Sequence, residues 1–376
     1  MKLTLKIKLL PSKEQANFLL QTIKEANAVC NDISEIAWTH KIFNQFKIHH
    51  EVYHKIKGSS KLSAQVLVRC ISKVADSYKL DKKIKRAFRP LGSITYDSRI
   101  LSYMSDVVSI WSAGGRLKMP FICHNPKYFP YIKGEADLVF NKGKFYLFQT
   151  VEIPDTDIKD VEEFIGVDFG LTDIAVTSDG KKYSAEWLNQ YREKRRKIRS
   201  SIQRKGTRSS KKLQKRLRGK ERTTATIQNH TIAKRIVQSA KEQGKGISIE
   251  DLTNIRFTAK RRNKKFRIKL ENWSFGQLRS FLEYKAALSG VPIVSVGPAY
   301  TSKTCHVCKH IGERKNKVFE CINPKCVIGI IDADLNAANN IATLGAVVNQ
   351  PEKSSMYSCS VHYLGLKSIQ PMLPAN

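Results

Sequence analysis

The stretch FIGVDFGLTDIAVTSDGKKYS, residues 164–184, carries the clearest structural pattern in this chain of 376 residues. Its apolar runs FIGVDFG and DIAVTS predict two strands, Asp179-Gly180 predicts a tight turn, and KKYS predicts a third strand. Asp168 lies in the middle of the first run, among apolar residues. A carboxylate in a buried strand is costly unless it is paired or binds a metal, so Asp168 is a candidate metal ligand.

Two further acidic residues, separated by intervals of 82 and 84 residues, extend this pattern. Glu250 ends the apolar run 247–250, which predicts a buried strand, and Asp334 opens a segment, DLNAANNIA, that predicts a helix. Asp334 alone could be a helix N-cap, and Asp332 could replace it as a ligand. Three such acids together favour a shared site for two Mg²⁺ ions, which prefer carboxylate oxygens and together can catalyse phosphodiester hydrolysis.

Four of the eight cysteines form a cluster with metal-ligand spacing, Cys305-x2-Cys308-x12-Cys321-x4-Cys326. Two close pairs of cysteines, each in a tight turn, can surround Zn²⁺ with tetrahedral geometry. We expect a structural zinc here, because four thiolates leave no open position for catalysis. The neighbouring His306 and His310 are then not needed as ligands, and the alternative is a set of free buried cysteines.

Positive charge is concentrated in one part of the chain. Lys and Arg number 66 against 33 Asp and Glu, and residues 181–270 hold 30 basic and 6 acidic residues. This concentration predicts a polyanionic partner, for which nucleic acid fits best. The alternatives are a solvated basic face and nonspecific binding of RNA. A membrane surface fits less well, because no strong apolar face accompanies the charge.

The most basic part of this region, residues 191–222, has 16 Lys and Arg and two Glu. Ile198, Ile202, Leu213 and Leu217 have partial helical spacing, which favours basic helices over a disordered run. We expect these helices to contact phosphates rather than to read bases. The candidate contacts are Arg192, Arg195, Arg196, Arg199, Arg204, Lys211, Lys212, Lys215 and Arg216.

No stretch approaches the roughly 20 apolar residues that cross a bilayer. The N-terminal segment MKLTLKIKLL alternates lysines with apolar residues. It therefore predicts a strand rather than the apolar core of a signal peptide, and we expect a cytoplasmic protein without a membrane partner.

The first 155 residues have a pattern of their own. A strand over residues 1–10 is followed by Ser12 and Gln15, which resemble a capping box opening a helix, and a second helix is predicted over about 63–88. Short β-like runs then return, including a hairpin around residues 141–143. We interpret this region as a β-rich domain with a helical insertion.

We therefore predict a chain with α/β and β-rich domains. The predicted divisions are a β-rich domain at 1–10 and 93–155, a helical lobe at 11–92, an α/β domain at 164–302 and 327–344, a zinc ribbon at 303–326, and a flexible tail at 345–376.

Three segments resemble the RuvC motifs of TnpB proteins and of the related type V CRISPR effectors: GVDFGLTDIAV, ISIEDL and DADLNAANNI. The segment WSFGQLRSFLEYKAALSGVPIVSVGPAYTSKTC, residues 273–305, is also similar to that family's segment before its zinc site. The similarity is specific across about residues 164–343. It implies an RNase H-like (RuvC) nuclease domain with an inserted zinc ribbon, a β-barrel-like wedge domain, and a helical recognition lobe.

The resemblance also implies a function. A protein of this family would be encoded by a transposon and would cleave double-stranded DNA, guided by an RNA, next to a short flanking motif. Asp168, Glu250 and Asp334 would hold Mg²⁺, and the basic helices would lie along the duplex formed by a guide RNA from the transposon end and its DNA target. A prokaryotic protein of this kind would be cytoplasmic and nucleoid-associated when bound to DNA, and one monomer per guide RNA is favoured.

Three alternatives share the predicted fold. An RNA-guided DNA-binding protein without cleavage is disfavoured because its relatives lose active-site acids, whereas all three are present here. A transposase with the same fold would join DNA strands. A small CRISPR effector would have the same active site.

Overall fold

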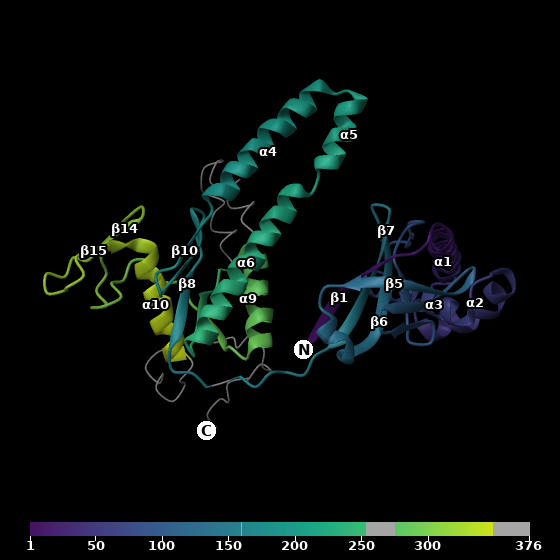
Figure 1. Ribbon diagram of the computed structural model, residues 1–376, viewed down its shortest axis with the longest axis horizontal. Coiled ribbons are helices and arrows are strands. Elements are labelled where there is room, and N and C mark those ends of the chain that lie inside the picture. The colour runs from purple at the N-terminus through teal and green to yellow at the C-terminus, as the bar shows by residue number, and fades with distance from the viewer. Residues whose placement is uncertain (159, 253–274, 349–376) are drawn as a thin grey trace. The chain divides into compact units, whose positions relative to one another are not determined.

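The computed structural model describes residues 1–158, 160–252 and 275–348, which belong to two compact units (Figure 1). We refer to Met1–Pro154 as the N-terminal unit and to Asp155–Asn376 as the C-terminal unit. Each unit has a sheet and a hydrophobic core of its own.

The N-terminal unit is built on a seven-stranded antiparallel sheet that forms a nearly closed barrel. The strand order is β2-β6-β7-β1-β5-β4-β3. The hydroxyl of Tyr96 on β2 donates a hydrogen bond of 3.0 Å to the carbonyl of Trp111 on β4, and so links strands that are distant in this order. The bounds are β1 (Lys2–Leu9), β2 (Ile94–Tyr96), β3 (Leu101–Met104), β4 (Val107–Ser112), β5 (Gly115–Cys123), η1 (Pro126–Tyr131), β6 (Ile132–Asn141) and β7 (Lys144–Glu152).

Local sequence explains these strands well. In β1, Leu5, Ile7 and Leu9 are buried while alternate residues face outward, as the period of a strand requires. The predicted hairpin is confirmed, because Asn141 pairs with Lys144 across a two-residue turn. Both turn residues, Lys142 and Gly143, have positive φ, which matches the turn that best continues the twist of a hairpin.

Three helices, α1 (Lys13–Thr39), α2 (Gln45–Ser59) and α3 (Ala64–Leu80), lie between β1 and β2 in the chain. The capping box of Ser12 and Gln15 is confirmed. The second predicted helix begins where expected, with Ser63 as its N-cap, but it was predicted to extend too far, since α3 ends at Leu80. Beyond that point the carbonyl of Arg86 accepts a hydrogen bond of 2.7 Å from Ser34 on α1, so a tertiary contact replaces the helical ones. The sequence analysis did not identify α2.

The C-terminal unit has a five-stranded mixed sheet in the order β10-β9-β8-β11-β12. The three-strand antiparallel run predicted from residues 164–184 is present as β8 (Phe164–Asp168), β9 (Asp173–Thr177) and β10 (Lys182–Ser184). Next to it, β11 (Gly246–Glu250) and β12 (Ile293–Val296) run parallel to β8. The strand order thus places the carboxyl ends of β8 and β11 beside each other.

Helices cover both faces of this sheet. Ile165 and Ile247 share a core with α6 (Lys220–Glu242) and α9 (Phe275–Ser289), while Phe164 packs with α10 (Ala333–Val348). At Gly166 a Cβ atom would lie 1.9 Å from the backbone of α10, so only glycine permits this close contact. Helix α10 continues to Val348, inside the segment predicted to be a tail. Residues 349–376 of that segment lie outside the described residues.

Two structures project from the sheet. The basic segment forms α4 (Glu186–Lys205), α5 (Arg208–Leu217) and the first part of α6, which together make a helical arm that turns at Gly206 (Figure 1). The four cysteines belong to a small ribbon with strands β13 (Glu313–Lys315), β14 (Val318–Glu320) and β15 (Ile330–Asp332). The fold class predicted from sequence is confirmed, whereas the finer domain boundaries stay predictions.

Candidate active site and metal centre

Asp168 and Glu250 end two neighbouring parallel strands. Val167 of β8 is in register with Ile249 of β11, so the next residue of each strand reaches the same edge of the sheet. Val167 and Ile249 belong to the core beneath α6 and α9. Because side chains alternate along a strand, Asp168 and Glu250 face the opposite side, where α10 packs.

Asp334 approaches this edge from the first turn of α10. The carboxylate of Asp332 caps that helix by accepting hydrogen bonds from the backbone N–H groups of Asp334 and Leu335, each of 3.0 Å. Asp332 also pairs with Lys182 at 2.6 Å. The capping role considered for Asp334 therefore belongs to Asp332, and the Asp334 side chain is available to the site.

The three acids interact electrostatically. Burial, followed by the charges of Glu250 and Asp334, raises the pKa of Asp168 to about 8. Burial also raises the pKa of Glu250. Such repulsion is what a divalent cation would relieve. Among the described residues, only four cysteines place ligand atoms all within 4.8 Å of one another, so the carboxylates are neighbours in a more open arrangement.

Two cations from the ribbon partly balance this charge. Arg314 on β13 contacts Asp334 at 2.7 Å, and Lys317 lies 3.8 Å from the same carboxylate while it pairs with Asp173. In the described part of the chain, no cationic side chain lies within 4.0 Å of Asp168. Asp168 thus has no ion pair with a described residue that would favour its ionised form, and the three carboxylate donors fit Mg²⁺. Neither cation was identified from the sequence.

Thr301 holds Glu250 in place. Its hydroxyl donates a hydrogen bond to Glu250 Oε1, and its carbonyl accepts one of 2.9 Å from the side chain of Asn340 on α10. All three residues are buried. The sequence analysis missed Thr301 and Asn340, because a single buried hydroxyl or amide has no periodic signal.

The four cysteines come together as their spacing predicts. The Sγ atoms of Cys305 and Cys326 lie 3.7 Å apart, and those of Cys308 and Cys321 lie 3.5 Å apart. Four thiolates about 2.3 Å from a tetrahedral Zn²⁺ are separated by about 3.8 Å, so the cluster is consistent with a structural zinc. A hydrogen bond with the backbone of His310 is the main cause that lowers the pKa of Cys308, which favours the thiolate.

Neither nearby histidine belongs to the cysteine cluster, as expected. The backbone N–H of His306 donates to Asn336 Oδ1 at 2.9 Å, and the amide of Asn336 donates to the carbonyl of Thr304 at 2.8 Å. Asn336 is fully buried on α10. The cysteine ribbon is thereby attached to the helix that carries Asp334.

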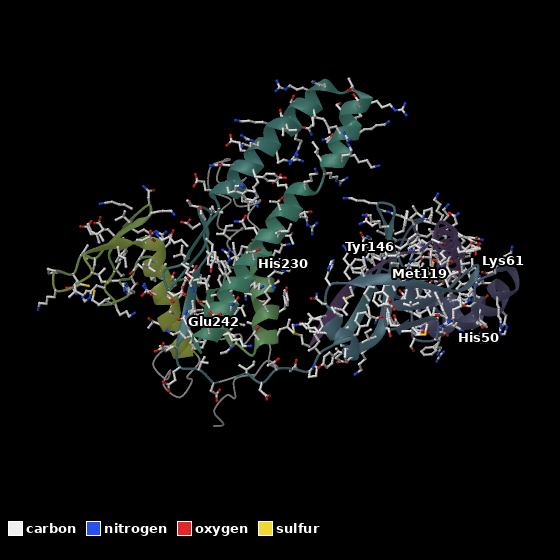
Figure 2. All side chains as sticks on the ribbon, in the orientation of Figure 1. His50, Lys61, Met119, Tyr146, His230 and Glu242 are labelled. Atoms are coloured by element: carbon white, nitrogen blue, oxygen red, sulfur yellow. The ribbon has the colours of Figure 1, made fainter. Side chains whose placement is uncertain are left out.

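The arm presents most of its predicted basic contacts to solvent, and nitrogen-tipped side chains follow α4 and α5 (Figure 2). Three of the arginines also connect helices. Arg192 and Arg199 pair with Glu221 on α6, and Arg195 donates to the carbonyl of Leu217 at 2.9 Å. The exposed members are Arg196, Arg199, Arg204, Lys211, Lys212, Lys215 and Arg216.

Below the arm, α6 packs on α9 through aromatic contacts. His230 on α6, marked in Figure 2, stacks on Phe281 with the ring centroids 3.7 Å apart. Its Nδ1 lies 3.3 Å from the hydroxyl of Tyr284. These contacts attach the base of the arm to the core of the unit.

Comparison with known proteins finds similarity to a TnpB-like protein and to Cas12f nucleases. Residues 275–341 match the model of the Cas12f1-like TNB domain. A TnpB-like protein of Methanocaldococcus jannaschii is 27% identical over 73% of this chain and 96% of its own length. The CRISPR-associated endodeoxyribonuclease Cas12f2 of a Micrarchaeota archaeon is 32% identical over 54% of this chain, but only 40% of its own length is matched.

A solved structure also shares the fold. The Cas12f1 chain of a Cas12f1–sgRNA–target DNA complex superposes with a TM-score of 0.58 over 88% of this chain and 83% of its own, at 16% sequence identity. In the part of the chain that the structure describes, no helix is both long and apolar enough to span a bilayer.

Proposed function

Because the chain is related to TnpB-like proteins and to Cas12f nucleases, we propose that it is a metal-dependent, RNA-guided DNA endonuclease. Its proposed guide is an RNA made from a transposon end, and its proposed substrate is double-stranded DNA beside a short flanking motif. The observation that carries this proposal is the group of three acids at one edge of the sheet, where burial and then the charges of Glu250 and Asp334 raise the pKa of Asp168 to about 8.

In this proposal Asp168, Glu250 and Asp334 hold two Mg²⁺ ions. The ions would supply an activated water and stabilise the leaving 3′ oxygen. Thr301 holds the Glu250 carboxylate by a hydrogen bond, and Asp332 caps the start of α10, so that the Asp334 carboxylate is not used as the cap. Arg314 and Lys317 supply positive charge beside the acids, where a phosphate would approach.

The other parts have supporting roles. The zinc-like cluster has four protein ligands and no open position, so it would keep the ribbon cations beside Asp334. The exposed cations of the arm would contact phosphates of the guide–target duplex without reading its sequence. The N-terminal unit would correspond to the β-barrel-like wedge domain and the helical recognition lobe that the family resemblance implies.

The test is cleavage by the full chain with its own RNA. The protein is expressed together with its flanking locus, the copurifying RNA is sequenced, and the variable end is reprogrammed against a plasmid that carries a randomised flank. Cutting that requires Mg²⁺, the matched guide and Asp168 supports the proposal. Guided binding without cutting, or strand joining in place of hydrolysis, would exclude it, as would cutting that persists in Asp168→Ala.

A further inference from the structure

We propose that the arm has a pocket for one unstacked nucleotide, in addition to its phosphate-contacting surface. The pocket lies between α4, α5 and the start of α6, with a volume of about 600 Å³. Small-molecule sites typically have volumes of about 300–1,000 Å³. This inference rests on the proposed binding of nucleic acid, but not on cleavage.

The lining combines apolar and cationic side chains. Ile198, Ile202 and Leu217 supply the apolar part, and Ile198 remains 43% exposed. A surface that only follows a phosphate backbone has no need of exposed apolar side chains in a hollow. A nucleobase has an apolar face as well as polar edges, so an unstacked base matches this lining.

The cations around the pocket divide into two kinds. Arg195 and Arg199 line it with their guanidinium groups already held, the first by the carbonyl of Leu217 at 2.9 Å and the second by Glu221 at 3.1 Å. A fixed guanidinium plane is a surface on which a base can stack. Because Arg192 also lies near Glu221, this carboxylate is balanced and does not oppose an anion.

Lys211 and Lys215 are available for the phosphate. They lie four residues apart on α5, so both face the pocket, and both are exposed. Neither makes an ion pair within the described ranges of the chain. The same helix has a second pair with equal charge, Lys212 and Arg216, that does not line the pocket. This pair is the matched control.

An acidic protein segment is the competing occupant, and the surroundings argue against it. The basic surface continues beyond the pocket along α4 and α5, with 16 basic and two acidic residues in 191–222. A continuous polyanion is complementary to such a surface. The nucleic acid therefore has contacts on both sides of the pocket, and the pocket holds a base that has left the stack.

The experiment measures binding by the full chain after its copurifying RNA is removed with high salt. The probes are a fluorescent single-stranded RNA of 12 nucleotides and a duplex of the same length. Ile198→Gln replaces an apolar side chain of the pocket lining with a polar one, and Ile227→Gln makes the same change at a 62% exposed position on α6 outside the pocket. We expect Ile198→Gln to weaken binding of the single strand several-fold and of the duplex less than twofold, because the base loses an apolar contact, whereas Ile227→Gln changes neither.

The charge variants give an independent readout. Lys211→Gln with Lys215→Gln should weaken single-strand binding several-fold more than Lys212→Gln with Arg216→Gln, while both pairs affect the duplex equally. The proposal of a nucleotide site would be overturned if the pocket variants weakened binding of both probes equally. It would also be overturned if a polyglutamate peptide competed as well as RNA. Since no cleavage is measured, failure of the nuclease proposal would appear separately, as absent cutting by a protein that still prefers unpaired RNA.

Discussion

Replacing Asp168 with asparagine should make the metal-free protein more stable while it removes a metal ligand. Asparagine has nearly the same shape but no charge. In the folded chain, burial and the charges of Glu250 and Asp334 raise the pKa of Asp168 from 3.8 to about 8. A carboxylate that is harder to ionise in the folded state opposes folding once the pH lies above its ordinary pKa.

The magnitude follows from the shift. Each pKa unit corresponds to about 1.36 kcal/mol, so the full shift gives about 5–6 kcal/mol as an upper value. Asp168 is only partly shielded from solvent, and an amide in its place also loses hydration, so we expect a net gain of about 2–3 kcal/mol. For a unit of this size that gain raises Tm by roughly 4–10 °C.

The stability difference between Asp168→Asn and the parent protein should change with pH in a defined direction. Between pH 3.8 and about 8 the folded state holds a proton on Asp168 that the unfolded state has released, so the stability of the parent protein falls across this range. The advantage of Asp168→Asn should therefore grow from pH 5 to pH 8. Urea and thermal unfolding in EDTA measure it, and added Mg²⁺ should stabilise the parent more than the variant.

The control is Asp179→Asn. Hydrogen bonds with Lys181, Thr177 and Ser239 overcome partial burial and lower the pKa of Asp179 to about 2, so its charge stabilises the fold at neutral pH and this stabilisation is lost only in acid. The control should destabilise the protein. If Asp168→Asn in EDTA at pH 8 were no more stable than the parent, burial and the neighbouring acids would not oppose ionisation of Asp168, and the reasoning for the metal site would fail.

Three further outcomes are expected. Thr301→Val should raise the Mg²⁺ concentration needed for half-maximal cutting several-fold, because Glu250 loses its hydrogen-bond donor, and Thr301→Ser should restore the parent value. Cys305→Ser should lower the zinc content measured by elemental analysis from about one ion per chain and destabilise the ribbon; a parent protein without zinc would contradict the cluster assignment. Gly166→Ala should cost at least about 3 kcal/mol of unfolding free energy, since its Cβ would collide with the backbone of α10, whereas Gly276→Ala, with open space around its Cβ, should be nearly neutral.

Much of the fold was accessible from local patterns. The apolar runs around Asp168 predicted the first strands of the mixed sheet, the Ser12 and Gln15 pair predicted the start of α1, and the cysteine spacing predicted the cluster. The strand and cap signals work because each depends on residues close together in the chain, and the cysteine signal works because its two close pairs have the spacing of zinc ligands. The end of α3 was misplaced for the opposite reason, because the segment after Leu80 is held by a distant hydrogen bond from Ser34 to the carbonyl of Arg86.

The amino-acid sequence by itself determined which residue types could do the chemistry, namely three acids, four cysteines and a basic segment. Only the tertiary structure decided how they are used. It paired β8 with β11, assigned the helix cap to Asp332 rather than Asp334, and brought Arg314 and Thr301 to the acids. Periodicity records which face of an element is buried, whereas the contacts made by single polar side chains arise only when distant segments pack together.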